Sequence, residues 1–317
     1  MPQQLPKSPA DYIVPLNING LDGRLLHVPA PKGKANDPEI MFVYGHHSSL
    51  ERWWGVAQVL NRYGAVTVPD LPGFGGMDSL YTIGRKPTID NLADYLAAFI
   101  KLRYKRKKVI IAGMSFGFVI VTRMLQRYPE LTKKVVLLVS IVGFAHKDDF
   151  TFSWSRYHGY MFGCQLFSRR LPAAVFRHTA LQPWVLRTFY GRTHNAKHKF
   201  AQANDAEDLK RLQDVEIGLW HDNDVRTWAF TTIEFLRFDN CKVRVDLPLW
   251  HVAAKADHFF DEHVVEQHMR VIFKEFHSVS IDVTNHAPSV IADAKEAAPL
   301  FPVTLRRKLT QLIPQEK

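Results

Sequence analysis

The chain has 317 residues, of which 46% are hydrophobic and 23% are charged, and its formal net charge is +10. A chain of this length buries roughly three quarters of the surface that its unfolded form exposes, so it can form a large globular core. No apolar run approaches the ~18–20 residues that a membrane-spanning helix needs, and no basic head with an apolar stretch behind it opens the chain. The two cysteines, Cys164 and Cys241, show no metal-ligand spacing and no disulfide framework, which favours a cytoplasmic protein.

The predicted elements begin with two strands of alternating polarity, Tyr12–Asn17 and Arg24–Val28, which favour an antiparallel pair at the edge of a sheet. Six later strands are short and apolar throughout, as strands buried on both faces are: Ile40–Tyr44, Ala65–Val68, Val109–Ala112, Val135–Ser140, Leu249–Ala253 and Val279–Val283. Helices of mixed polarity are predicted between them at Leu50–Tyr63, Ile89–Tyr104, Phe116–Tyr128 and Glu262–Glu275. This alternation predicts an α/β fold with a mostly parallel, doubly wound sheet.

The densest positive charge lies at residues 101–108, at the end of the helix predicted from Ile89. Cations at this position complement the carbonyl end of the helix dipole, so a solvated helix end is the simplest interpretation. Peripheral contact with an anionic membrane is the alternative, and the basic tail Leu305–Leu312 would take part in it. Nucleic-acid binding is not predicted, because the chain has no zinc-finger spacing, helix-turn-helix signature or basic–aromatic sheet.

Residues 147–242 interrupt the alternation, because no convincing strand occurs among them. So long a stretch cannot be a structureless loop in a compact protein, so we expect a helical cap inserted into a core of residues 1–146 and 243–317. Aromatic residues are frequent in this insertion, and they either line a substrate cavity or pack the insertion's own core. They are Phe150, Phe152, Trp154, Tyr157, Tyr160, Phe162, Phe167, Phe176, Trp184, Phe189, Tyr190, Trp220 and Trp228.

One short motif indicates catalysis. Gly113-Met114-Ser115-Phe116-Gly117 lies between a predicted strand and a predicted helix, which is the context of a nucleophile elbow. In such a turn the serine hydroxyl points out at the carboxyl edge of the sheet, where open α/β folds bind ligands. Ser115 is therefore the predicted catalytic nucleophile.

Serine needs a base to take its proton and a carboxylate to orient that base. His286 follows the last predicted strand and is the expected base among fifteen histidines. Asp257 follows the preceding strand and is the expected carboxylate. Asp261 is its rival, although Asp261 also stands where it would cap the helix predicted from Glu262. The order serine, aspartate, histidine is the one expected for this arrangement.

An oxyanion hole requires two backbone donors beside the nucleophile. The N–H of Phe116 would begin the helix after Ser115. The N–H of His46 would come from the loop after the strand Ile40–Tyr44, where Gly45 permits close approach of the backbone.

From Ile40 to about Pro288 these residues resemble the α/β-hydrolase superfamily, in its branch with a cap inserted after the sixth strand. The resemblance rests on residues 43–46 (Val-Tyr-Gly-His), 69–75 (Pro-Asp-Leu-Pro-Gly-Phe-Gly), 113–117 and 285–288 (Asn-His-Ala-Pro). It implies that Ser115, Asp257 and His286 form a catalytic triad and that Asp70 is structural. Tyr44 departs from the family, which usually has histidine before the glycine, and Phe118 replaces a small residue. Dehalogenases and epoxide hydrolases of this fold use aspartate at the elbow, so Ser115 argues against those activities.

We therefore expect a carboxylesterase-like serine hydrolase that acts on an ester, thioester or related acyl bond of an apolar small molecule and requires no metal or organic cofactor. The same triad also serves carbon–carbon bond hydrolysis, aminopeptidase-type cleavage and cofactor-free oxidation, because the cap and pocket set the specificity of this fold. A non-catalytic member that binds a partner or an anionic membrane is a third alternative.

Overall fold

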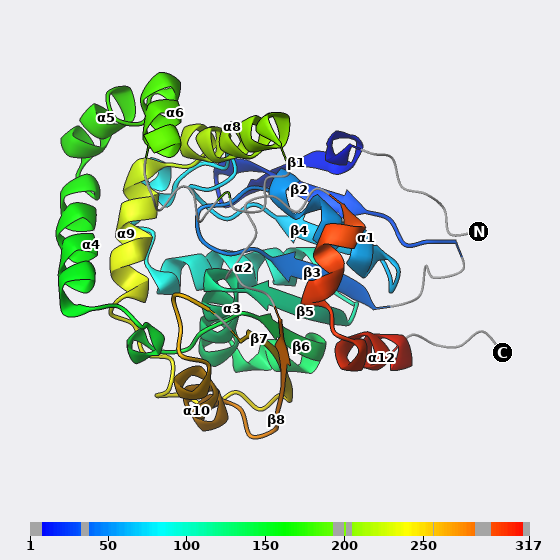
Figure 1. Ribbon diagram of the computed structural model, residues 1–317. Coiled ribbons are helices and arrows are strands. Elements are labelled where there is room, and N and C mark those ends of the chain that lie inside the picture. Colours follow the sequence, from blue (N-terminus) through cyan, green and yellow to red (C-terminus); the bar gives the residue numbers. More distant parts are fainter. Residues whose placement is uncertain are drawn as a thin grey trace.

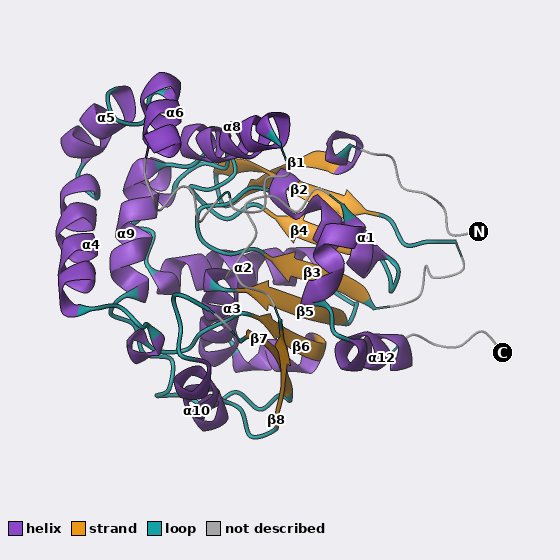
Figure 2. Cartoon of the chain, in the orientation of Figure 1, coloured by secondary structure: helices purple, strands orange, loops and turns teal. Residues whose placement is uncertain are grey.

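A computed structural model describes residues 8–32, 38–192, 200, 205–255, 257–282 and 293–312. Its centre is an eight-stranded sheet in the order β1-β2-β4-β3-β5-β6-β7-β8 (Figure 2). The strands are β1 Ile13–Ile18, β2 Leu21–Val28, β3 Glu39–Val43, β4 Val66–Pro69, β5 Val109–Met114, β6 Val135–Ile141, β7 Leu249–Ala254 and β8 Phe276–Ile281.

The strands of the sheet pair as the sequence predicted, with an antiparallel pair at one edge and parallel strands elsewhere. β1 and β2 form an antiparallel hairpin, and β2 also pairs antiparallel with β4. Asn19 and Gly20 connect the hairpin with positive φ angles of 54° and 79°, the combination that tight hairpin turns require. The remaining pairs, from β4–β3 to β7–β8, are parallel. The predicted doubly wound α/β fold is therefore confirmed.

Most predicted strands agree with the observed ones to within two residues. β2 begins at Leu21, three residues before the predicted start, and β8 differs at both ends. It begins at Phe276, three residues before the predicted start, and ends at Ile281. β8 is an edge strand in which His277, Ser278 and Ser280 are exposed. A half-exposed strand alternates in polarity instead of being apolar throughout, so its first half lacked the pattern of a buried strand.

Helices cover both faces of the sheet. They are α1 Trp54–Asn61, α2 Ile89–Arg103, α3 Phe116–Arg127, α10 Glu262–Ile272, α11 Ala294–Ala297 and α12 Val303–Gln311. α2 packs against α3 and α1 packs against α11, and the two pairs lie on opposite faces (Figure 1). Short 3-10 helices accompany them at Pro9–Tyr12, Glu51–Trp53, Leu80–Ile83, Pro129–Lys134, Lys147–Asp149 and Ala298–Leu300. The helix predicted over Leu50–Tyr63 is thus a 3-10 turn followed by α1.

The described residues between β6 and β7 form the α-helices α4 Trp154–Phe167, α5 Arg170–His178, α6 Pro183–Arg192, α8 Ala206–Asp222 and α9 Val225–Phe235. Over the part of this segment that the structure describes, no strand joins the sheet. α4, α5 and α6 form an outer layer, and α9 lies between α4 and the sheet (Figure 1). The boundaries of a separate cap domain stay a prediction, but the expected helical character of the insertion is observed.

The turn between α8 and α9 is bonded to the loop that follows β4. The backbone N–H of Gly75 donates to Asn223 Oδ1 at 2.7 Å, and the N–H of Asp224 donates to the carbonyl of Gly73 at 2.8 Å. An ideal Cβ on Gly73 would lie 2.5 Å from Thr227 Oγ1, so only glycine permits this contact. These bonds hold α9 beside the strand ends.

The basic end of α2 is largely paired within the protein. Lys101 contacts Glu130 at 3.0 Å, and Arg103 and Lys107 both contact the buried carboxylate of Glu39. These contacts support the interpretation of this charge as a helix end. The apolar side of α12 is also occupied, because Leu305 is buried in the main core. None of the helices in the described parts of the chain has the length and apolar character that a membrane crossing requires.

Candidate active site

Ser115 lies in a strained turn between β5 and α3. Its φ and ψ are 48° and −123°, a region that residues other than glycine rarely occupy. The backbone N–H of Ser115 donates to the carbonyl of Ile141 on β6 at 3.0 Å, which ties the turn to the neighbouring strand. The strand, the strained serine and the helix follow one another as the sequence predicted.

The glycines on either side of the turn make this close packing possible. An ideal Cβ on Gly113 would lie 2.7 Å from the Cα of Phe118. One on Gly117 would overlap the carbonyl oxygens of Val43 and Tyr44 at the end of β3. The spacing of the motif is therefore explained by the approach of β3, β5 and α3 to one another.

The loop after β3, residues 45–49, passes directly beside the nucleophile, and we call it the oxyanion loop. An ideal Cβ on Gly45 would lie 3.2 Å from Ser115 Cβ and 3.7 Å from Ser115 Oγ. His46 and Phe116, the predicted oxyanion donors, line the same pocket as Ser115. Phe116 is the first residue of α3, and the first N–H groups of a helix have no partner within it. Donation by these two groups to a substrate oxyanion stays a prediction.

The side chain of His46 fastens the oxyanion loop to α9. Its Nε2 lies 2.8 Å from Thr231 Oγ1, and its ring packs edge-on against Phe116 and Phe235. Burial lowers the pKa of His46 to about 3, so the imidazole is neutral near pH 7. The sequence reasoning left this side chain without a role, whereas the structure gives it one in positioning the loop.

The two candidate carboxylates have different surroundings. Asp257 follows β7, is half-buried, and accepts a hydrogen bond from the N–H of Phe259 at 2.8 Å. Asp261 is exposed and caps α10, accepting from the N–H groups of His263 and Val264 at 2.9 and 3.1 Å. The capping role expected for Asp261 is therefore present, and Asp257 remains the better candidate for the triad. His286 lies outside the described residues, so its contact with Asp257 stays a prediction.

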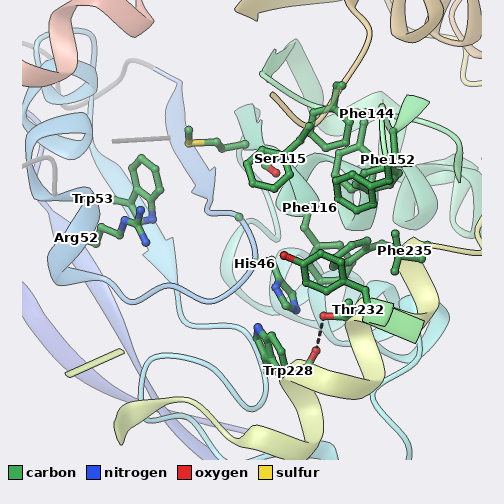
Figure 3. A pocket seen from close by; sticks show the side chains of 17 residues that line it. His46, Arg52, Trp53, Ser115, Phe116, Phe144, Phe152, Trp228, Thr232 and Phe235 are labelled. Atoms are coloured by element: carbon green, nitrogen blue, oxygen red, sulfur yellow. Dashed lines mark hydrogen bonds between the residues drawn. The ribbon is translucent and has the colours of Figure 1, made fainter. Parts of the chain in front are cut away.

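A cavity of about 340 Å³ opens at Ser115. Figure 3 shows Arg52 and Trp53 on one side of it and the rings of Phe144, Phe152 and Phe235 on another. Its wall comes from the core strand ends and from the helical insertion: Gly45, His46, Arg52, Trp53, Met114, Ser115, Phe116, Phe144, Phe150, Phe152, Tyr160, Trp228, Thr232, Phe235, Leu236, Phe259 and Phe260. Among the residues that the structure describes, no cluster of His, Cys, Asp and Glu could hold a metal ion.

All of the named aromatic residues of the insertion except Tyr157 fall into three groups, so both interpretations of them hold in part. Phe150, Phe152, Tyr160 and Trp228 line the cavity. Phe167, Phe176, Tyr190 and Trp220 pack around a small separate core with Ile217 and Leu186. Trp154, Phe162, Trp184 and Phe189 are exposed.

Among the described side chains of the cavity wall, Arg52 is the one with a formal charge, and it was not predicted from the sequence. It lies in the 3-10 turn before α1, with its guanidinium 3.9 Å from Glu216 of α8 and 5.6 Å from the centre of the Trp53 ring. Burial lowers the pKa of Arg52. The sequence around Arg52 does not indicate a binding residue. Arg52 lines the cavity only because the helices of the insertion pack beside the 3-10 turn that carries it.

Asp70, which the resemblance implied to be structural, is buried behind the site. Its carboxylate accepts a hydrogen bond from Tyr44 at 2.7 Å and from Arg24 at 3.2 Å. Burial raises the pKa values of both Asp70 and Tyr44 well above their usual ranges. Tyr44 also accepts a bond from the N–H of Leu71 at 3.0 Å. The departure from the family at Tyr44 thus ties the end of β3 to the loop after β4.

Comparison with known proteins agrees with this architecture. A family model described as alpha/beta hydrolase fold matches residues 38–267. The chain is 32% identical to Protein ABHD8 of Homo sapiens over 108 residues, which cover 34% of this chain and 24% of that protein. The alignment therefore spans about a quarter of the length of that relative.

Two solved structures show the same fold at low sequence identity. An esterase from Thermogutta terrifontis superposes with a TM-score of 0.60 at 16% identity, over 95% of this chain and 99% of that one. An enol-lactonase from Burkholderia xenovorans LB400 superposes with a TM-score of 0.63 at 13% identity, over 94% of this chain and 100% of that one. Both likenesses extend over nearly the whole chain and show the fold.

Proposed function

The chain belongs to the alpha/beta hydrolase fold family, and from this premise we propose that it is a serine hydrolase of the carboxylesterase type. It cleaves an ester, thioester or related acyl bond, with Ser115 as nucleophile. One observation carries the proposal: a strained serine between β5 and α3 borders a largely apolar cavity of about 340 Å³, with the oxyanion loop against its Cβ.

In this mechanism Ser115 Oγ attacks the acyl carbon while His286 takes the hydroxyl proton. Asp257 orients the imidazole and stabilises its cation. The N–H groups of His46 and Phe116 bind the oxyanion of the tetrahedral intermediate, which collapses as His286 protonates the leaving group. Water, activated by the same histidine, then attacks the acyl-enzyme and releases the acid.

The cavity wall favours an apolar acyl or aryl group. Aromatic rings from β6–α4 and α9 surround Ser115, and pockets of roughly 300–1,000 Å³ accept small molecules rather than polymers. The names of two proteins of the same fold, an esterase and an enol-lactonase, give further support to acyl-bond hydrolysis.

The proposal is tested with a fluorophosphonate probe and p-nitrophenyl esters of increasing acyl length. We expect labelling at Ser115, hydrolysis that falls once the acyl chain exceeds the cavity, and loss of both in Ser115→Ala. Ser155→Ala is a matched control, because Ser155 is an exposed serine on α4. An unlabelled protein, or a Ser115→Ala variant as active as the wild type, would refute the proposal.

A further inference from the structure

The outer side of α4 exposes a stripe of apolar residues. Trp154, Phe162 and Leu166 have 76%, 74% and 42% of their surface exposed. They stand at multiples of four residues along the helix, so they share one face. The buried Met161 and Cys164 lie on the side of α4 that packs against α9. α4 is therefore apolar on both sides, although only one side is covered by the protein.

The next two helices continue this surface. On α5, Leu171 and Val175 are 79% and 62% exposed, and on α6 Trp184 and Phe189 are 72% and 55% exposed. Figure 1 shows α4, α5 and α6 in succession along one outer side of the molecule. We call the exposed apolar residues of these three helices the α4–α6 face.

Outside the α4–α6 face, the exposed apolar residues of the described surface are not grouped. Apart from Phe259, its other large exposed apolar residues are aliphatic and scattered over separate elements, such as Val14, Leu102 and Val303. Single exposed apolar residues are ordinary on a protein surface, whereas a contiguous group marks an interaction site. All the exposed tryptophans of the described residues belong to the α4–α6 face.

The charge of the segment that contains α4, α5 and α6 indicates what kind of surface the α4–α6 face would bind. Residues 150–204 contain eight Lys and Arg and no Asp or Glu. Arg156, Arg169 and Arg170 are exposed on or beside α4 and α5, and the exposed Arg187 of α6 forms an ion pair with Asp214 of α8. Exposed tryptophan and phenylalanine beside arginine, without acidic residues, match the interface of an anionic lipid bilayer. A second copy of the same face would bring like charges together, which disfavours self-association.

The cavity wall also includes partly exposed residues, one of them on α4. Tyr160 of α4 lines the cavity and is 41% exposed, and Phe259, also at the cavity wall, is 37% exposed. Arg156 lies over the ring of Phe152, another wall residue, at 4.3 Å. α4 therefore contributes Tyr160 to the cavity wall from a different side than the one that carries the exposed stripe.

We propose that the α4–α6 face docks on an anionic lipid surface. In the docked protein the tryptophan and phenylalanine side chains enter the boundary between headgroups and acyl chains, and the arginines contact the phosphate groups. Docking brings α4, which also contributes Tyr160 to the cavity wall, against the bilayer.

The experiment is co-sedimentation of the full chain with phosphatidylcholine vesicles, with and without about one third of phosphatidylglycerol. We expect binding only to the anionic vesicles, and weaker binding at high salt because exposed charges are screened. Arg169→Gln/Arg170→Gln should weaken binding by about twenty-five-fold, from about fivefold for each charge near the surface. Trp154→Ser/Phe162→Ser should weaken it by about tenfold or more through lost apolar burial.

Lys105→Gln/Arg106→Gln is the matched control, because it removes two exposed charges at the end of α2 and should change binding less than about twofold. Ser115→Ala should bind as the wild type does, which separates docking from catalysis. Melting curves and probe labelling of Ser115 check that the surface variants fold. Absence of vesicle binding would overturn the proposal, as would an equal loss in the α2 control. A dimer in light scattering that Trp154→Ser/Phe162→Ser dissociates, without vesicle binding, would assign the face to a second copy and also overturn it.

Discussion

Because two histidines are buried, we expect the folded protein to lose stability in mild acid. Burial lowers the pKa of His46 to about 3 and that of His251, on β7, to about 4, from an ordinary value of 6.5. The partners of both imidazoles are neutral: His46 bonds to Thr231 Oγ1 and to the backbone of Trp228, and His251 Nδ1 lies 2.9 Å from Ser140 Oγ. Below pH 6.5 the unfolded chain binds a proton at each ring and the folded chain does not, so the free energy of unfolding falls with pH.

The magnitude follows from the two shifts. One pKa unit corresponds to about 1.36 kcal/mol. Between pH 7 and pH 4.5 each histidine therefore removes about 2.5 kcal/mol of stability, and the pair removes about 5 kcal/mol. A loss of this size is a large part of the roughly 5–15 kcal/mol that stabilises an ordinary domain.

The assay is urea unfolding at pH 7 and pH 4.5 for the wild type and His251→Asn. Asparagine places a polar atom near the position of Nδ1 but does not titrate, and contributions from carboxylates cancel between the two proteins. The loss of unfolding free energy over this range should be about 2.5 kcal/mol smaller in the variant, whatever its stability at pH 7. Equal losses in both proteins would refute the assignment of acid sensitivity to His251.

Three further predictions concern the site. Gly117→Ala should abolish turnover and lower the free energy of unfolding by about 3 kcal/mol, because the added methyl group would overlap backbone carbonyl oxygens. Its control is Gly159→Ala on α4, where a methyl group meets open space; it should raise the free energy of unfolding by about 0.5–1 kcal/mol, as measured by thermal melts. Asp257→Asn should lower kcat about 10⁴-fold, while Asp261→Ala should cost about 1 kcal/mol through the lost cap and keep kcat; the reverse pattern would make Asp261 the triad acid. Thr231→Val should lower kcat with little change in Tm, and Thr231→Ser should restore it; equal activity in both variants would contradict the role of its hydroxyl.

The sheet could be predicted from the sequence because its central strands are buried on both faces. β3 and β5 are apolar through nearly their whole length, and the glycines around Ser115 indicated a close crossing of backbones. The assignment of Asp261 also followed from a local rule, since a helix cap depends only on residues within one turn.

The cavity wall could not be predicted in the same way. Trp154 and Tyr160 lie on one short helix, yet the first is exposed to solvent and the second lines the cavity. When a helix carries apolar residues on more than one side, the sequence does not reveal which side faces a neighbour. Arg52 and Trp53 reach the cavity only because α8 and α9 lie opposite them in the folded chain.

The hydrogen bond between His46 and Thr231 has a mechanical consequence. It joins the loop that would stabilise the oxyanion to α9, a helix of the cavity wall. A displacement of α9 away from Ser115 would break the His46–Thr231 hydrogen bond or move the oxyanion loop away from the nucleophile. Admission of substrate and competence for bond cleavage would then belong to alternating states of the molecule, so that Ser115 is reactive only behind a closed wall.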